Sequence, residues 1–466
     1  MFVLKRAFLK IGPLTFYREA LSIALPVMLQ QFIMSMVSLI DNFMVAGLGD
    51  SSMASVNVAN QINFVYIVLV NTVCGAGGIY LAQFKGAGDQ AGMRHAYRFK
   101  VIFALAASVV FFILCWTIPE LMIAVMTPGN NAQAEIVAQG SEYLRFTACT
   151  LVPIAISSAI GSSFREIGLP KIPLMISACA TVINTIGNWL LIYGNMGAPR
   201  LGIVGAALAT ILARLCELSF FIIYVHKRQS PFFVGFMSLF RIDKKLIKEI
   251  FVKSLMMFAS ELSWISSETV VTALLNGRGG AETVAGMAAG FTIANIFFLV
   301  FSGVWTASTV IIGGSLGAGK LEEARSRGEW IQSGAVITGI VVALLGVAAS
   351  VALVPVVFSN LSDSARRISL GIVFVILVYL PLWALLNALF AISRAGGDTA
   401  MGMWADVSVN TILFLPGAFI LAFTTSLGPV ALYAILKISD IAKYLVARHF
   451  FNKERWIRNL TLRVSE

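Results

Sequence analysis

The chain has 466 residues, of which 58% are hydrophobic and only 12% are charged, and its mean hydropathy is +0.86. An ordinary soluble domain carries about 25% charged residues, so this composition excludes a soluble globular protein. The formal net charge of +11 does not indicate a nucleic-acid partner, because the basic residues gather in loops between long apolar runs.

Twelve apolar runs follow one another along the chain, each long enough to cross a hydrocarbon core of about 30 Å as a helix. They lie near 19–47, 53–82, 100–119, 142–163, 172–194, 202–225, 254–276, 283–313, 332–358, 369–392, 400–424 and 427–447. In lipid only helices and closed barrels satisfy their backbone groups, and these runs are too long and too little alternating for barrel strands. The sequence therefore predicts an all-α polytopic membrane protein with twelve transmembrane helices.

The second half of the chain repeats the first at an offset that falls from 231 to 223 residues. The matching pairs are Gly86 and Gly317, Arg165 and Arg394, Gly168 and Gly397, Asn184 and Asn410, Arg214 and Lys437, and Glu217 and Asp440. Six spans per half is an even number, so both halves enter from the same side. This predicts two six-helix lobes related by a pseudo-twofold along the membrane normal, an architecture of transporters that work by alternating access.

The basic residues set the expected boundaries and orientation. We predict an N-terminal lobe over 1–225, a basic cytoplasmic linker over 226–253, and a C-terminal lobe with a basic cytoplasmic tail over 254–466. Because Lys and Arg stay on the cytoplasmic side, both termini are expected inside the cell, with the protein in the inner membrane. The pair Arg366 and Arg367 lies on the opposite side and is an exception whose role the sequence does not assign.

The first span contains a carboxylate at depth, Asp41. Such a group costs roughly 2.5 to 3.5 kcal/mol on insertion scales, so it is a functional candidate by default. Gln31 and Ser38 lie along nearby turns and form a polar stripe with it. Pro26 precedes them, removes one backbone hydrogen bond and is a candidate hinge.

Amides on two further spans are expected to face the same pocket. The second span carries Asn57, Asn60 and Gln61 on one face, and the fifth carries Asn184 and Asn188 at i, i+4. Burial disfavours an ionised carboxyl, whereas a bound cation or donated hydrogen bonds favour it, so this pocket can load and release H⁺ or Na⁺. Carboxylate and amide oxygens suit a hard cation. A hydrogen-bond knot that only joins helices remains the alternative.

The seventh span presents Glu261, Trp264 and Glu268 at i, i+3, i+7, which is one face of a helix. Two acids beside an aromatic ring can attract an organic cation, or they can be paired with bases. Asp406 in the eleventh span stands alone and has no assigned role. The five cysteines, odd in number and without a CxxC motif, indicate neither a disulfide framework nor a zinc site.

Several strings resemble the multidrug and toxic compound extrusion (MATE) family. The stretch from Leu39 to Gly49 resembles the helix 1 signature of that family, and the Gly-Ala-Gly loops, the turn from Phe164 to Gly168 and the run from Asn184 to Gly205 resemble later motifs. The similarity covers nearly the whole chain, and the order and duplication of the motifs make it specific.

The resemblance implies a secondary antiporter that exports amphipathic, mostly cationic organic compounds in exchange for H⁺ or Na⁺. It implies that Asp41, helped by Asn184 and Asn188, binds the coupling ion and that helix 1 bends near Pro26. Glu261 matches an acidic position that some members carry. Tyr379 matches a tyrosine of a second cation site, but Trp383 stands where those members have an Asp, so no second-half Na⁺ site is expected.

Two other functions, a flippase and a membrane-embedded enzyme, are less consistent with the sequence. A flippase for lipid-linked precursors is the nearest alternative, but it calls for a strongly cationic cleft, and only Arg145, Arg214 and Lys437 are bases at membrane depth. A membrane-embedded enzyme would need a nucleophile, metal ligands or a paired acid and base at depth, and it is not expected, because the spans show no membrane-centred His and no motif of that kind. The implied partners are small organic substrates and membrane lipid. No cofactor beyond the coupling ion and no obligate protein partner is implied. H⁺ and Na⁺ use the same oxygens, so the sequence leaves both open.

Overall fold

The computed structural model describes residues 10–128, 132–241, 243–277 and 279–463. The first residues of the predicted N-terminal lobe and the last residues of the predicted tail therefore lie outside the described part.

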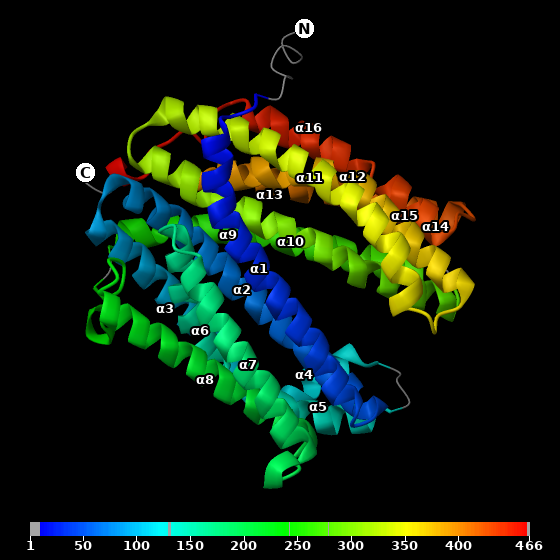
Figure 1. Ribbon diagram of the computed structural model, residues 1–466. Helices are drawn as coiled ribbons and strands as arrows, with labels where there is room; N and C mark the ends of the chain where they lie inside the picture. The colour runs from blue at the N-terminus through cyan, green and yellow to red at the C-terminus, as the bar shows by residue number, and fades with distance from the viewer. Residues whose placement is uncertain (1–9, 129–131, 242, 278, 464–466) are drawn as a thin grey trace. The chain divides into compact units, whose positions relative to one another are not determined.

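The described part of the first half consists of helices joined by short connections (Figure 1). Its elements are α1 (Leu14–Ala46), α2 (Asp50–Ala87), α3 (Gln90–Thr117), α4 (Pro119–Met126), α5 (Gln133–Ala148), α6 (Leu151–Glu166), α7 (Lys171–Tyr193), the short η1 (Asn195–Gly197), α8 (Gly202–Arg228) and η2 (Phe236–Ser238). The span predicted over 142–163 is a bent pair, because α5 and α6 meet at an angle of 50°. Pro153 near the start of α6 has no N–H to continue the helix ladder across this bend.

The second half repeats this order with more breaks. Its elements are α9 (Lys244–Gly277), α10 (Ala281–Gly317), α11 (Leu321–Val357), α12 (Asp363–Ala395), α13 (Ala400–Val409), the π-helical η3 (Asn410–Phe414), α14 (Leu415–Thr424), α15 (Pro429–Leu436), α16 (Ser439–Phe451) and η4 (Thr461–Arg463). The span predicted over 400–424 contains the π-turn, and the one predicted over 427–447 breaks at Lys437.

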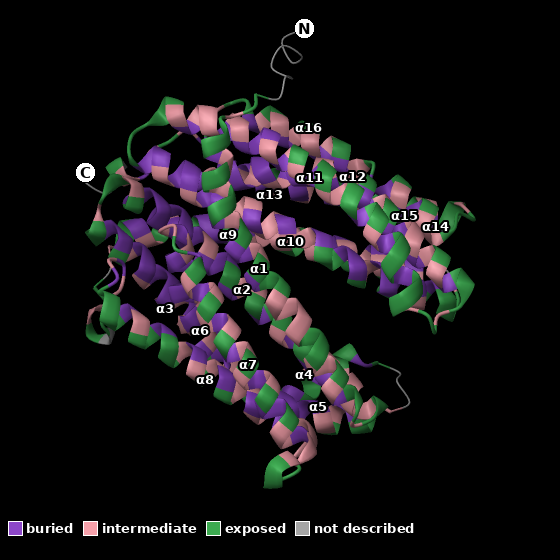
Figure 2. Cartoon of the chain, viewed as in Figure 1, coloured by how far each residue is buried: buried purple, intermediate pink, exposed green. Residues whose placement is uncertain are grey.

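The membrane architecture follows from these lengths. Among the described residues, nine helices are long and apolar enough to cross a membrane, and the bent pair α5–α6 would make ten. The polar α9, which carries Glu261 and Glu268, and the broken pair α15–α16 complete two sets of six. Large apolar side chains such as Val378 and Phe423 are more than 70% exposed, as lipid-facing residues should be. Exposed residues occur along the length of many helices (Figure 2). The all-α, twelve-helix fold predicted from the sequence is confirmed.

Backbone geometry supports the internal repeat independently of side-chain identity. Gly88 and Gly319, 231 residues apart, both end a long helix with positive φ, at 74° and 75°. The residue after each donates to a carbonyl five positions earlier, at 2.9 Å and 3.0 Å. Gly168 and Gly397 show the same pattern, with φ of 85° and 82°. These paired Schellman turns need glycine, because L side chains rarely adopt this conformation.

Contacts divide the chain into two compact units whose borders fall inside helices. One unit holds Leu29–Ser254, and the other holds the described residues up to Met28 together with those from Leu255 onward. The first turns of α1 therefore pack in the second unit, where the ring of Phe16 lies 5.1 Å from that of Trp330. The first turns of α9 pack in the first unit, where Phe251 lies 5.2 Å from Phe103.

The segment that follows the last helix of each half folds back onto its own unit. Of the linker predicted over 226–253, the first residues belong to α8 and the last ones to α9. The connection between the two helices is therefore 229–243. There Phe232 is fully buried, with its ring 5.1 Å from that of Phe164. In the tail, Trp456 is 3% exposed and stacks on Phe451 at 5.2 Å. Both segments are thus packed caps over one end of a helix bundle.

Candidate ion and substrate site

The predicted acid on α1 meets one of the two predicted amides on α7. Asn188 Nδ2 donates a hydrogen bond of 2.8 Å to Asp41 Oδ1. Asn188 is 2% exposed, and its Oδ1 has no hydrogen-bond partner. A carboxylate beside a buried, unpartnered amide oxygen offers ligands to a small hard cation or a hydrogen-bonded proton donor.

The second amide on α7 takes a different partner. Asn184 Nδ2 donates to Thr210 Oγ1 on α8 at 3.3 Å. One turn separates Asn184 from Asn188, so both lie on the same face of α7. The structure therefore joins Asp41 directly to Asn188, while Asn184 fastens α7 to α8.

Close packing of α7 on α8 holds this face in place. The two helices lie side by side as a hairpin (Figure 1). At Gly187 a Cβ atom would lie only 2.9 Å from Cβ of Ala209. A small residue beside Asn188 therefore lets the helix backbones approach, as in other membrane helix pairs.

Two titratable residues that the sequence did not assign to the pocket lie within electrostatic reach of Asp41: Arg214 on α8, whose positive charge acts on Asp41, and the 6% exposed Tyr143 on α5, on which the charge of Asp41 acts. The ion-pair partner of Arg214 is Glu217 and not Asp41: Arg214 Nη1 lies 2.7 Å from Glu217 Oε2. Asp41 thus sits near a base that another carboxylate neutralises.

A chain of hydrogen bonds extends from that ion pair to α1. Ser177 Oγ on α7 donates to Glu217 Oε1 at 2.9 Å, and Gln30 Nε2 on α1 donates to Ser177 Oγ at 3.0 Å. Gln30, Ser177 and Glu217 are all less than 10% exposed. The buried polar side chain of this part of α1 is therefore Gln30, whereas its predicted neighbour Gln31 is exposed. Only side-chain direction in the folded helix distinguishes these neighbours.

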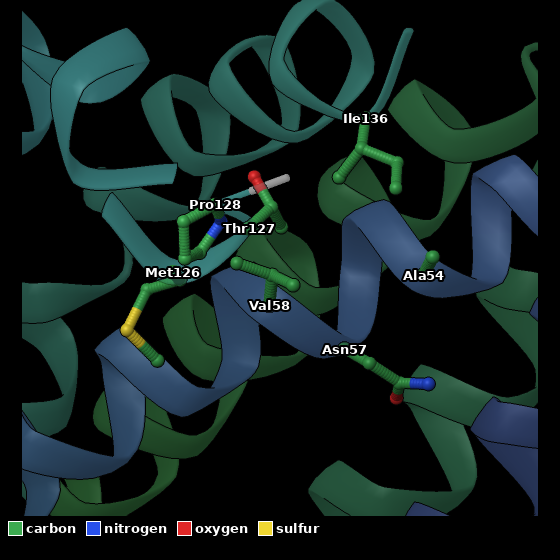
Figure 3. Close-up of a pocket in the computed structure, with 7 residues that line it drawn as sticks. All are labelled: Ala54, Asn57, Val58, Met126, Thr127, Pro128 and Ile136. Atoms are coloured by element: carbon green, nitrogen blue, oxygen red, sulfur yellow. The ribbon is translucent and has the colours of Figure 1, made fainter. Parts of the chain in front are cut away.

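The other predicted lining residues of the first unit are spread over its surface. Gln31, Ser38, Asn60 and Gln61 are exposed, and Asn57 is half-buried. Asn57 lines a cavity of about 450 Å³ between α2, α4 and α5 (Figure 3). The remaining residues around the cavity are Ala54, Val58, Met126, Thr127, Pro128 and Ile136. Asp41 is not among the described residues that line this cavity, so a role in the pocket for the five predicted polar residues stays a prediction.

In the second unit, both predicted acids of α9 already have basic partners. Glu261 Oε1 lies 3.2 Å from Arg394 Nη1, and Glu268 is bridged to Lys437. Trp264 between them is exposed, at 48%. The α9 face therefore carries two ion pairs rather than two free carboxylates.

Aromatic rings surround the second of these pairs. Lys437 Nζ lies 4.9 to 5.5 Å from the ring centres of Trp383, Phe414 and Tyr433. The predicted Tyr379 stacks on Trp383 at 5.9 Å and donates its hydroxyl to the Ala434 carbonyl at 3.1 Å. Lys437 and Asp440 are the repeat counterparts of the paired Arg214 and Glu217, but they take other partners. Lys437 binds Glu268, and Asp440 accepts from Trp383 Nε1 at 2.8 Å.

Metal ligands of the transition-metal kind do not gather in the described part of the chain. No group of three or more His, Cys, Asp or Glu side chains is placed there to hold an ion. The predicted hinge residue, Pro26, is buried in α1, two residues before the border between the units.

The sequence family is shown by comparison with known proteins. The family model described as MatE matches residues 26–190 and again 256–420, one match in each half. The chain therefore belongs to the MatE family of membrane transporters.

Two relatives align with this chain over about nine-tenths of their own length. "Probable multidrug resistance protein NorM" of Bradyrhizobium diazoefficiens is 26% identical over 433 residues, or 89% of this chain and 88% of that protein. The NorM protein of Halalkalibacterium halodurans is 25% identical over 92% of both. Other matches are shorter, and the one to the Rhizobium meliloti NorM protein spans 65% of that relative.

Solved structures agree in fold. A mutant of the Vibrio cholerae MATE transporter VcmN superposes with a TM-score of 0.83 at 16% identity, covering 95% of this chain and 98% of that one. A MATE structure in complex with MaL6 gives 0.82 at 19% identity, covering 94% and 97%. At these identities the likeness concerns the fold alone.

Proposed function

We propose that this transporter is a secondary active antiporter that exports small amphipathic organic compounds, mostly cationic, in exchange for H⁺ or Na⁺. The names of the NorM relatives support efflux of drugs as the cellular role. The observation that carries the coupling proposal is the Asp41–Asn188 contact with the unpartnered Asn188 Oδ1 beside it. A site with one carboxylate, one amide oxygen and no clamping base can bind and release a small cation in each cycle.

The membrane potential supplies enough free energy to drive such an exchange. One charge falling through 100 mV supplies about 2.3 kcal/mol. This corresponds to roughly a fiftyfold substrate gradient before any ion gradient is added. Alternating access would expose Asp41 first to one side and then to the other, with α1 bending near Pro26. The proposed location is the inner membrane with both termini cytoplasmic.

The rival function, transport of lipid-linked precursors, calls for unpaired bases at depth. All three candidate bases are paired: Arg145 with Glu120 at 2.6 Å, Arg214 with Glu217 at 2.7 Å, and Lys437 with Glu268. Paired bases do not make a pyrophosphate site, which supports export of small organic cations instead. For the same reason, Glu261 and Glu268 could attract a cationic substrate only if their ion pairs open.

The test is efflux from proteoliposomes in which the pH gradient and the Na⁺ gradient are imposed separately. We expect one of the two gradients to drive efflux of a lipophilic organic cation by the wild-type protein and to fail with Asp41→Asn. The matched control is Asp363→Asn, which removes an exposed acid at the start of α12. Efflux that needs neither gradient, or that Asp41→Asn leaves intact, would refute the antiport proposal.

A further inference from the structure

Three arginines gather at the end of the first unit where α3 begins. Arg94 and Arg98 lie one turn apart on α3, and Arg241 lies near the end of the connection between α8 and α9. That connection packs on α3, because Arg94 Nε donates to the Pro231 carbonyl at 3.3 Å. The charges of Arg94 and Arg241 both act on Arg98, and like charges repel. We call these three residues the arginine cluster.

No ion pair neutralises the arginine cluster within the described part of the chain. Arg98 is half-buried, and its Nη1 lies 3.3 Å from His95 Nδ1, whereas the other two arginines are exposed. Two acids, Asp89 and Asp243, lie within electrostatic reach of His95. Each of them accepts a backbone hydrogen bond at the start of a helix, Asp89 at α3 with 3.0 Å and Asp243 at α9 with 2.8 Å. The cluster is therefore open to an anionic ligand from outside the protein.

The second half of the chain shows the same place with its charges matched. The repeat offset of 231 puts Arg325 opposite Arg94. It also puts an acid, Glu329, opposite Arg98. The tail segment supplies Glu454 to Arg325, at 2.7 Å, whereas the corresponding connection in the first half gives Arg94 only a carbonyl oxygen. Unmatched arginines at this place are thus peculiar to the first half.

Exposed apolar side chains lie in the same connection, directly before Arg241. Met237 is 95% exposed and Phe240 is 71% exposed, although Phe232 a few residues earlier is fully buried. Apolar side chains beside unpaired bases are typical of segments at a membrane surface, where the apolar groups enter the lipid and the bases meet anionic headgroups. This combination favours a lipid over a dissolved anion as the ligand.

The planar fork of an arginine side chain matches the oxygens of a phosphate group and binds them by two hydrogen bonds. We propose that the arginine cluster binds the phosphate headgroup of an anionic membrane lipid at the end of the first unit, with Met237 and Phe240 against its acyl chains. A zwitterionic lipid carries its own positive charge, which the cluster repels. The site lies at helix ends, so it does not provide the bases at membrane depth that transport of lipid-linked precursors calls for.

The test is native mass spectrometry of the purified full-length protein in detergent, which counts bound lipids while phosphatidylglycerol is titrated. Arg94→Gln/Arg241→Gln removes two exposed charges and should keep the fold. We expect its affinity for phosphatidylglycerol to fall roughly thirtyfold, because each base near a headgroup contributes about a factor of five. Arg98→Gln, made separately, should lower the affinity about fivefold. The matched control is Lys227→Gln/Arg228→Gln, which removes two exposed bases at the end of α8 and should leave the affinity within about twofold.

Phosphatidylcholine and inorganic phosphate are the comparison ligands. Phosphatidylcholine should bind more weakly than phosphatidylglycerol, with no difference between the wild type and the variants, and inorganic phosphate should not displace the bound lipid. Unchanged phosphatidylglycerol affinity in the arginine variants, or an equal loss in the control, would overturn the proposal. Displacement by inorganic phosphate would overturn it as well, because the cluster would then be a site for a dissolved anion.

The inference does not rest on the proposed antiport. If the double arginine variant does not fold, Arg98→Gln decides. Because neither an ion gradient nor a drug enters the measurement, a negative result here is distinct from a failure of Asp41-dependent efflux.

Discussion

Asn188 holds the carboxylate of Asp41 by one hydrogen bond of 2.8 Å, while the amide oxygen of the same side chain stays buried and unpartnered. The two residues lie 147 positions apart in the chain, on α1 and α7. One side chain thus both orients the acid and offers it a second oxygen ligand.

Asn188→Ala should weaken binding of the coupling ion more than Asn184→Ala. A hydrogen bond to a charged group contributes about 1.5 to 3 kcal/mol, which is roughly a tenfold to hundredfold change in affinity. Asn184 donates to Thr210 instead, so its loss should change ion affinity by less than about threefold. The dependence of efflux on ion concentration in proteoliposomes measures both variants, and equal effects would contradict the geometry.

Gly187→Ala should separate α7 from α8 and destabilise the first unit. The added Cβ would meet Ala209 at 2.9 Å, and such overpacking costs typically about 1 to 3 kcal/mol. The matched control is Gly314→Ala in α10, where a Cβ meets nothing within 4 Å. That control should be neutral or more stable by about 0.5 to 1 kcal/mol, since alanine favours helix. Thermal unfolding in detergent distinguishes the two.

Lys100→Met should destabilise the first unit strongly. Lys100 on α3 is fully buried, and its ammonium forms an ion pair with Glu166 and hydrogen bonds of 3.2 Å to Ser162 and Ser163. Removing one partner of a buried pair costs about 3 to 5 kcal/mol, because the other charge is left uncompensated.

The double variant Lys100→Met/Glu166→Gln should recover much of that loss, because no lone buried charge remains. Unfolding of the single and double variants in the same detergent gives the comparison. A double variant as unstable as the single one would mean that the stability comes from the packing of Lys100 and not from its charge.

Phe232→Ala and Trp456→Ala should each loosen one unit. Both rings are buried in the segments that cap the bundles, and truncating a buried aromatic ring costs about 3 to 5 kcal/mol. Met237→Ala in the same loop as Phe232 is the control, since Met237 is 95% exposed. Limited proteolysis should cut the two capping segments faster in the aromatic variants. Cleavage at the wild-type rate would show that the caps do not depend on these anchors.

Local sequence was enough to predict the helices, because hydrophobic length and turn-forming glycine are local signals. The Gly88 and Gly319 turns, and the run that became α1, could be recognised from residues next to one another. The breaks at Lys437 and at Asn410 could not, because the polar partners that accompany them, Glu268 and Ser263, come from α9.

The sequence also could not predict which of the site residues form hydrogen bonds with one another. Asn184 and Asn188 are equivalent by spacing, and Gln30 and Gln31 are neighbours of the same type. Only the packing of α7 against α1 and α8 decides which amide reaches Asp41 and which glutamine is buried. Nothing in the sequence indicated that Tyr143 lies near Asp41, since an aromatic residue in an apolar span is ordinary.

The sequence by itself determined the membrane fold, the duplication and the presence of one costly acid in the first span, because hydropathy, repeat spacing and a lone carboxylate can be recognised along the chain. The tertiary structure decided how the charges are matched: it paired Glu261 and Glu268 with bases from distant helices and placed Asp406 and Asp440 on a single lysine. Electrostatic balance depends on distances through space, and these exist only once the helices have packed.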